Sequence, residues 1–142
     1  MKNKSTLWWV AGLAVLIVVL LVWSKTSQNN DPDIVARGAF HWHPELTIYV
    51  KGEKQEIPSN IGLGAVHQPI HTHEDINKGI VHLEFQVSAR KQEVTLGQFF
   101  KNWGKDIRSF GANMTMTVNG EENTEYENYV MRDKDKIELR YE

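Results

Sequence analysis

Histidine is the residue whose placement in this sequence suggests chemistry. All six histidines fall within residues 41–82, as two His-x-His pairs and two single residues: His41 and His43, His71 and His73, His67, and His82. In an extended chain, residues i and i+2 project to the same side, roughly 6.6 Å apart. Each pair can therefore direct two imidazoles at one ion. A stable metal site needs three or four ligands, so we expect the two pairs to converge.

The apolar residues beside the histidines predict which way the imidazoles point. His41 and His43 have the opposite parity to positions 46, 48 and 50, which are apolar and alternate with polar residues. His82 and Glu84 likewise alternate with the apolar positions 81, 83 and 85. If both segments are regular strands, these side chains leave the core face and meet on the other face of a sheet. The segment 71–74 then closes the site from a loop.

The sequence predicts a metal site whose ligands come from three segments. The predicted ligands are His41, His43, His71, His73 and His82, with His67 and Glu84 as weaker candidates. The carboxylates of Glu45, Glu74 and Glu84 are better explained as solvated groups or as groups that orient an imidazole. Met114 and Met116 alternate with a third apolar residue, which indicates core packing rather than copper(I) ligation.

The absence of cysteine narrows the choice of metal. It excludes disulfides, thiolate ligands and a lipidated-cysteine anchor. Ligation by imidazole alone suits zinc, copper(II), nickel or iron, and copper(II) stands above zinc in intrinsic affinity. We therefore expect a transition-metal ion, copper ahead of zinc, that the protein captures, buffers or hands over. A transfer would require a protein partner, which the sequence does not identify.

Two other interpretations of the histidines stay open at this stage. In the first, three histidines hold the metal and an open coordination position activates water or oxygen, with Glu74 or Glu84 as general base. The protein would then be a metalloenzyme, although nothing in the sequence specifies a substrate. In the second, the domain is a tethered β-grasp interaction module whose histidines sense pH.

An uninterrupted apolar run at residues 7–23 precedes the histidines. At about 1.5 Å per residue it crosses most of a ~30 Å hydrocarbon core, and tryptophans stand at both ends, where indole rings favour the membrane interface. The run lacks the small residues of a signal-peptidase site, so we expect an uncleaved anchor in the lipid bilayer rather than a cleaved signal peptide. Lys2 and Lys4 precede it, which predicts a single-pass cell-membrane protein with a cytoplasmic N-terminus and an extracytoplasmic (periplasmic) C-terminal domain.

The sequence divides into an anchor at 1–25, a polar linker at 26–38 and a histidine-rich domain at 39–142. The roughly 115 residues after the anchor are the usual size of one domain. Beyond residue 25 the chain carries 13 basic and 18 acidic residues, a formal charge of −5. This charge argues against nucleic acid as a partner.

The hydrophobic pattern predicts an α+β fold. Alternation predicts strands at 46–50, 80–87, 114–118 and 137–141, with a hairpin turn at 51–54, a second short strand ending at Pro58, a loop at 59–69 and another turn at 119–120. Thr95 and Gln98 have the spacing of a capping box, and apolar residues at 96, 99, 100 and 103 predict a short amphipathic helix before Gly104. A small mixed or antiparallel sheet with one such helix is similar to a β-grasp, with 80–87 as an additional strand.

Five segments carry a family resemblance, at residues 41–50, 57–62, 71–74, 79–84 and 95–104. They include the motifs His-Trp-His, His-Thr-His, Gly-x-x-His-x-Glu and Thr-Leu-Gly-x-Phe-Phe-x-x-Trp-Gly. In this order they resemble an uncharacterised family of small, membrane-tethered prokaryotic extracytoplasmic proteins. The resemblance spans about residues 41 to 142 and implies kinship, but no activity. Members often carry a cysteine before the Thr-His motif, where this chain has none at 65–70, so His67 is a candidate substitute or additional ligand.

Overall fold

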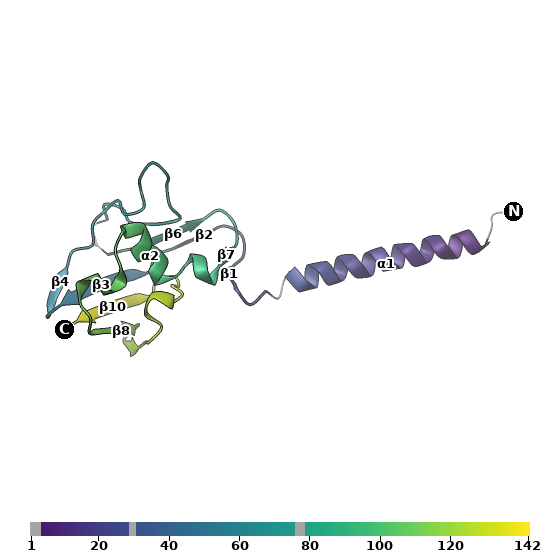
Figure 1. The fold of residues 1–142 in the computed structure, drawn as a ribbon. Coiled ribbons are helices and arrows are strands. Elements are labelled where there is room, and N and C mark those ends of the chain that lie inside the picture. Colours follow the sequence, from purple (N-terminus) through teal and green to yellow (C-terminus); the bar gives the residue numbers. More distant parts are fainter. Residues whose placement is uncertain (1–3, 29–30, 76–78) are drawn as a thin grey trace. The chain divides into compact units, whose positions relative to one another are not determined.

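The first element is a long apolar helix, α1, at Lys4–Gln28 (Figure 1). The computed structural model describes residues 4–28, 31–75 and 79–142, and the chain divides into two units, Met1–Asp33 and Ile34–Glu142. With 25 residues, α1 is about 37 Å long. Its stretch Trp8–Ser27 is long and apolar enough to cross a membrane. A helix that is apolar on every side is typical of a membrane span. The apolar run predicted at residues 7–23 is therefore confirmed as part of a helix that could span a membrane.

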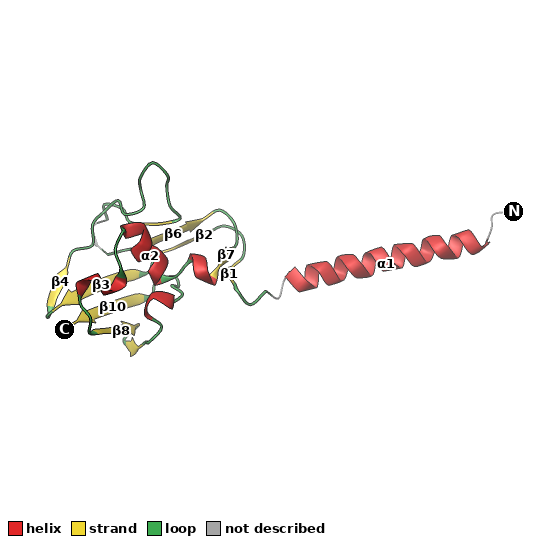
Figure 2. Cartoon of the chain, viewed as in Figure 1, coloured by secondary structure: helices red, strands yellow, loops and turns green. Residues whose placement is uncertain are grey.

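In the second unit, the described strands form three sheets (Figures 1 and 2). A five-stranded sheet has the order β4-β3-β10-β8-β9, with strands at Glu53–Gln55, Glu45–Val50, Lys136–Tyr141, Met114–Val118 and Glu121–Glu122. A three-stranded sheet has the order β2-β6-β5, at Phe40–Trp42, His82–Phe85 and Ile70–His71. The smallest sheet pairs β1 (Ile34–Ala36) with β7 (Ala89–Arg90).

The five-stranded sheet has the β-grasp arrangement predicted from the sequence. Its central strands β3 and β10 are parallel, with Leu46 opposite Ile137, and its other strand pairs are antiparallel. The hairpins β3–β4 and β8–β9 lie on either side of β10, and helix α2 (Leu96–Trp103) falls between the two hairpins in the sequence. The predicted α+β class is therefore confirmed. The three-stranded sheet is an addition, because β5 and β6 come between β4 and α2, and β2 precedes β3.

The apolar positions predicted to face the core do so, with one exception. Leu46 and Leu83 are buried in one cluster, and Met114 and Met116 belong to the same cluster, as predicted. The exception is Val87, which is 68% exposed. The paired part of β6 ends at position 85, opposite the first residue of β2, and the chain then bends. The predicted strand 80–87 was therefore too long at its C-terminal end.

Helix α2 begins and ends where the sequence predicts. The Thr95 hydroxyl accepts a hydrogen bond from Gln98 N at 3.2 Å, and Gly104 closes the helix with a left-handed φ of 72°. The predicted capping box forms only in part, because the Gln98 side chain donates to Asn102 Oδ1 at 2.9 Å instead of returning to the cap. Short 3-10 helices precede and follow α2 among the described residues: η1 at Lys91–Glu93, η2 at Ile107–Phe110 and η3 at Tyr126–Asn128.

The strand β1 lies within the stretch 26–38 that the sequence suggests as a linker. It pairs with β7, and Gly38 N donates to Ser88 Oγ at 3.0 Å. The second unit therefore begins at Ile34, while α1 continues to Gln28.

Two substitutions, one at the N-cap of α2 and one in its last turn, separate folding from site chemistry. Thr95→Ala should destabilise the domain by about 1 kcal/mol, because it removes the hydroxyl that caps α2. Trp103→Ala should cost less than the roughly 3–5 kcal/mol of a fully buried aromatic, since Trp103 is half-buried against Phe99, Phe100 and Phe110. Urea unfolding of the full chain in detergent micelles measures both costs. Metal affinity of the folded variants should match wild type, and a Trp103→Ala protein that folds normally yet loses metal would place the ring in the site.

Candidate metal centre

The three-stranded sheet brings histidines from three strands onto one face. In its register, His41 of β2 lies opposite Glu84 of β6, and His71 of β5 lies opposite His82 of β6. Directly opposed residues project to the same face, and so do residues two apart on one strand. These four side chains therefore share a face, while Leu83 between them is buried in the core. The alternation predicted for 81–85 is confirmed.

The assumption that 41–50 continues as one regular strand is wrong. β2 ends at Trp42, and β3 begins at Glu45 in a different sheet. The break coincides with Pro44, which has no N–H to donate to a strand ladder. His43 is instead held through its backbone N–H, which donates to Asp133 Oδ1 at 2.9 Å.

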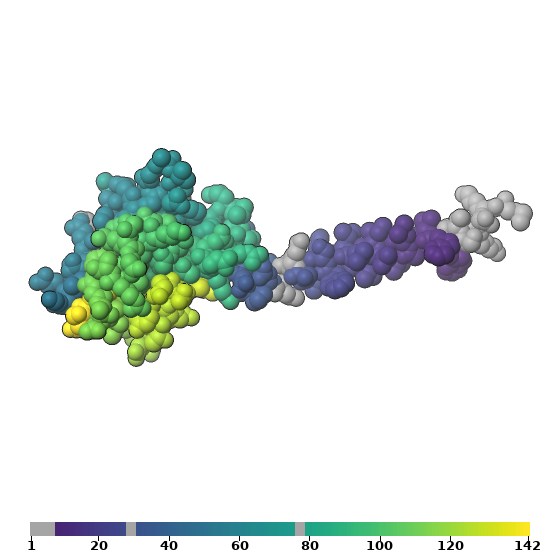
Figure 3. Space-filling model, in the orientation of Figure 1, coloured from purple at the N-terminus to yellow at the C-terminus, as the bar shows by residue number. Residues whose placement is uncertain are grey.

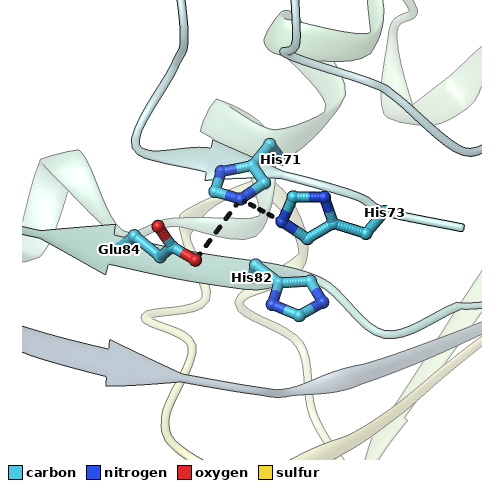
Figure 4. A group of neighbouring side chains, drawn as sticks. All are labelled: His71, His73, His82 and Glu84. Atoms are coloured by element: carbon cyan, nitrogen blue, oxygen red, sulfur yellow. Dashed lines mark hydrogen bonds and ion pairs between the residues drawn. The ribbon is translucent and has the colours of Figure 1, made fainter. Parts of the chain in front are cut away.

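The second pair, His71 and His73, is positioned by the threonine between them. Thr72 is buried, and its hydroxyl donates to Pro58 O at 2.9 Å and accepts from Ile61 N at 3.1 Å. Because Thr72 points into the 58–61 loop, the two histidines on either side of it project the opposite way. Figure 4 shows their imidazoles directed at each other and at β6.

The short strand β5 is held in place from several directions. Asn102 of α2 donates from Nδ2 to Ile70 O at 2.8 Å, and Glu84 N donates to Pro69 O at 2.8 Å. Gly62 lets the preceding loop approach the same strand. Its φ is +75°, and a Cβ there would lie 2.6 Å from Ile70 O, so any other residue would push the loop away from β5. The fold therefore fixes the strand that carries His71.

The first group of potential ligands, called here the inner set, consists of His71, His73, His82 and Glu84. One ligand atom from each lies within 4.8 Å of the others. His71 Nε2 is 3.0 Å from His73 Nε2 and 3.7 Å from Glu84 Oε1 (Figure 4). The His71 side chain is 0% exposed and His82 is buried, whereas His73 is exposed and Glu84 is half-buried. The inner set is therefore a mostly buried group with one open side.

A second group, called here the outer set, consists of His41, His43 and His82. Their ligand atoms also lie within 4.8 Å of one another. His41 Nε2 is 3.3 Å from His82 Nδ1 and 3.0 Å from Glu84 Oε1. The side chains of His41 and His43 are 48% and 44% exposed. His82 therefore belongs to both sets, and the five predicted histidines form two overlapping groups rather than a single one.

His67 contacts the cluster without belonging to either set. It lies in the loop at 62–69, which projects from the surface of the second unit (Figure 3). Its ring packs edge-on against the ring of His71, with the centroids 4.5 Å apart. Ring contacts thus connect all six histidines. His67, however, contacts the potential ligand His71 without contributing a ligand atom to either set.

In His71 and His82, a hydrogen bond to one ring nitrogen determines which nitrogen keeps a lone pair for a metal ion. His82 Nε2 is 2.9 Å from Asp75 Oδ2, so we assign the proton to Nε2 and the lone pair to Nδ1. His71 Nδ1 is 3.0 Å from Gln68 O, a carbonyl that can only accept, which leaves the lone pair on Nε2. Carboxylates and carbonyls hold metal-binding histidines in this way in known sites.

Sequence reasoning missed two carboxylates of the site, Asp133 beside His43 and Asp75 beside His82.

Asp75 is the one of these that holds a buried ligand. It continues the i, i+2 alternation of His71 and His73, and that signal could have identified it. Its partner His82, however, is seven residues away along the chain. No local pattern links the two.

The electrostatics of the cluster favour the neutral form of His71 and His43 and a bound cation. Burial lowers the pKa of His71 below its ordinary value, although the Gln68 carbonyl and Glu84 oppose this. Burial, together with His41 and His82, lowers the pKa of His43. A neutral imidazole is the form that binds metal. The carboxylates of Glu84, Asp75 and Asp133 lie beside the imidazoles and would offset the charge of a cation.

Comparisons of this chain with protein-family models, curated proteins and solved structures found no match. The inner set offers three imidazole nitrogens and one carboxylate oxygen. That number and type of ligand fits a tetrahedral zinc site or a nitrogen-rich copper(II) site.

Replacing Asp75 tests whether it orients His82. Asp75→Ala should lower the affinity for a transition metal about 10–100-fold, because His82 loses the group that fixes its tautomer and ring orientation. A competition titration against a chromophoric chelator measures this. Glu74→Ala is the matched control, since Glu74 is exposed and lies outside both sets. Equal affinities for the two variants would show that Asp75 has no part in binding.

Proposed function

We propose that this chain is a membrane-anchored, extracytoplasmic protein that binds a transition-metal ion in its histidine cluster and captures, buffers or hands over that ion. The observation that supports this most is the convergence of His71, His73, His82 and Glu84 within 4.8 Å. Two of the histidines are buried, and each has its second nitrogen hydrogen-bonded. These hydrogen bonds fix the orientation of both rings, as carboxylates and carbonyls do for metal-binding histidines.

Copper(II) is the preferred ion in this proposal, and zinc is the second candidate. The ligands are imidazoles with one carboxylate, and the chain has no cysteine to hold copper(I) or a thiolate-bound zinc. Met114 and Met116, whose thioether sulfurs are soft donors, are buried in the core. With nitrogen ligands alone, copper(II) binds more tightly than zinc.

The geometry supports one ion per chain. His82 contributes to both sets, and its Nε2 is occupied by Asp75. Only the Nδ1 lone pair remains, and one lone pair binds one ion at a time. The inner and outer sets therefore compete for the same ligand.

The cellular placement is also part of the proposal. The apolar helix α1 supports a single span, and the lysines before it support a cytoplasmic N-terminus. The motifs at 41–50, 57–62, 71–74, 79–84 and 95–104 support kinship with small, membrane-tethered prokaryotic proteins. A metal-binding domain fixed to the outer surface of the membrane is well placed to exchange ions with a membrane-bound partner.

Metal titration of histidine variants tests the proposed function. The full chain, purified without a polyhistidine tag, should saturate at one Cu(II) or Zn(II). His71→Ala and His82→Ala should each weaken binding at least about tenfold, because each removes a buried ligand. His67→Ala is the control and should change affinity less. If His71→Ala and His73→Ala leave affinity and stoichiometry unchanged while His41→Ala abolishes binding, the site is a local chelate beside β2 and the inner-set proposal fails.

Protease accessibility tests the placement. Protease added to intact cells or spheroplasts should digest residues 34–142, since the positive charge before α1 directs the C-terminal domain outward. Full protection of the domain would refute this orientation. A mature N-terminus near residue 25 would refute the anchor in favour of a cleaved signal peptide.

A further inference from the structure

We infer that His41 and His43 form an outer landing site, through which the ion reaches and leaves the inner set by stepwise ligand exchange on His82 and Glu84. This inference rests on the proposed function, because it concerns the route of the same ion. The first observation is the overlap of the two sets. His82 belongs to both, and His41 Nε2 lies 3.0 Å from Glu84 Oε1, an atom that is also 3.7 Å from His71 Nε2.

This overlap allows the ion to move without being released. Ligand atoms stand about 2.0–2.2 Å from a bound ion, so an ion beside His82 and Glu84 can reach either His41 or His71. It can therefore exchange one histidine for the other while two ligands remain bound. On a route of this kind the ion never loses all of its protein ligands at once.

The exposure of the ligands gives the route a direction. The outer side chains of His41 and His43 are 48% and 44% exposed, whereas His71 is 0% exposed and His82 is 11% exposed. An ion arriving from solvent, or from a partner that presents its own ligands, therefore meets an exposed histidine before it reaches His71, either in the outer pair or at His73 of the inner set.

Negative charge lies along the same route. Asp133 Oδ1 is 4.0 Å from His43 Nδ1 at the outer end, and Glu84 is in the middle. Asp75 is behind His82 at the inner end. Carboxylates in this order attract a cation at each step. The Asp133 carboxylate also accepts the backbone N–H of His43, which holds the outer pair at the mouth of the cluster.

A landing site has a kinetic signature that distinguishes it from a ligand of the resting ion. A residue needed only for the route changes loading and removal by the same factor, so the equilibrium affinity stays the same. A residue that holds the resting ion changes affinity. His43 is the residue to test, because His41 also contacts the inner-set carboxylate of Glu84.

The experiment is stopped-flow loading of the full chain in micelles with Cu(II), followed by removal with excess EDTA. His43→Ala should slow both phases about tenfold and leave the affinity within about threefold of wild type. Its Cu(II) EPR spectrum should also match wild type, since the resting ligands are intact. His67→Ala, a histidine of the same cluster outside both sets, should leave both rates unchanged.

Several results would overturn the inference. Unchanged rates in His43→Ala would mean that ions enter the inner set directly through the exposed His73 and do not use the outer pair. A loss of affinity with an altered EPR spectrum would make His43 a ligand of the resting ion. His43→Gln, which keeps a polar side chain, replaces His43→Ala if near-UV circular dichroism shows that the alanine variant is unfolded. A wild-type protein that binds no copper would refute the proposed function itself, a distinct outcome from a bound ion with an unaltered route.

Discussion

The pairing register of β2, β6 and β5 is the constraint on which the whole centre depends. It sets His71 opposite His82 and His41 opposite Glu84. Because the side-chain period of a strand is two, a slip of one residue would turn the ligands toward the core and Leu83 toward solvent. These strands have only two to four residues each, so their own hydrogen bonds cannot hold the register alone. The buried Thr72 hydroxyl and the Asn102 amide supply additional fixed points.

The β-grasp unit and the inner face of the added sheet share one core, and the outer face of the added sheet carries the chemistry. The central strands β3 and β10, helix α2 and the buried methionines form one apolar cluster. The chain reaches β6 along the start of β3, where Leu46 N donates to Gly79 O and Val81 N donates to Pro44 O. The polar face of the added sheet thus carries the histidines and carboxylates of the two sets, and its buried members His71 and His82 are held by hydrogen bonds. This division explains why substitutions in α2 and substitutions in the cluster should affect different properties.

Local periodicity was sufficient to predict part of this structure. The hairpin at β3, the cap at Thr95, the buried methionines and the alternation at 81–85 all follow from side chains that are close in sequence. Local periodicity did not predict three other features: the change of sheet at Pro44, the early end of β6 before Val87, and the hydrogen bond between Asp75 and His82. Each of these depends on which strand pairs with which, and an alternating pattern does not encode its partner. The division of the histidines into overlapping sets depends on the same long-range pairing.

The position of an ion bound in the protein tests the centre most directly. Crystals of the full chain loaded with Zn(II) or Cu(II), measured at the absorption edge of that metal, give its position by anomalous scattering. The predicted result is one peak per chain, about 2.0–2.2 Å from His71 Nε2 and His82 Nδ1, with His73 or Glu84 completing the sphere. A peak held by His41 and His43 alone, or a fully loaded crystal without a peak among the histidines, would contradict the proposed centre.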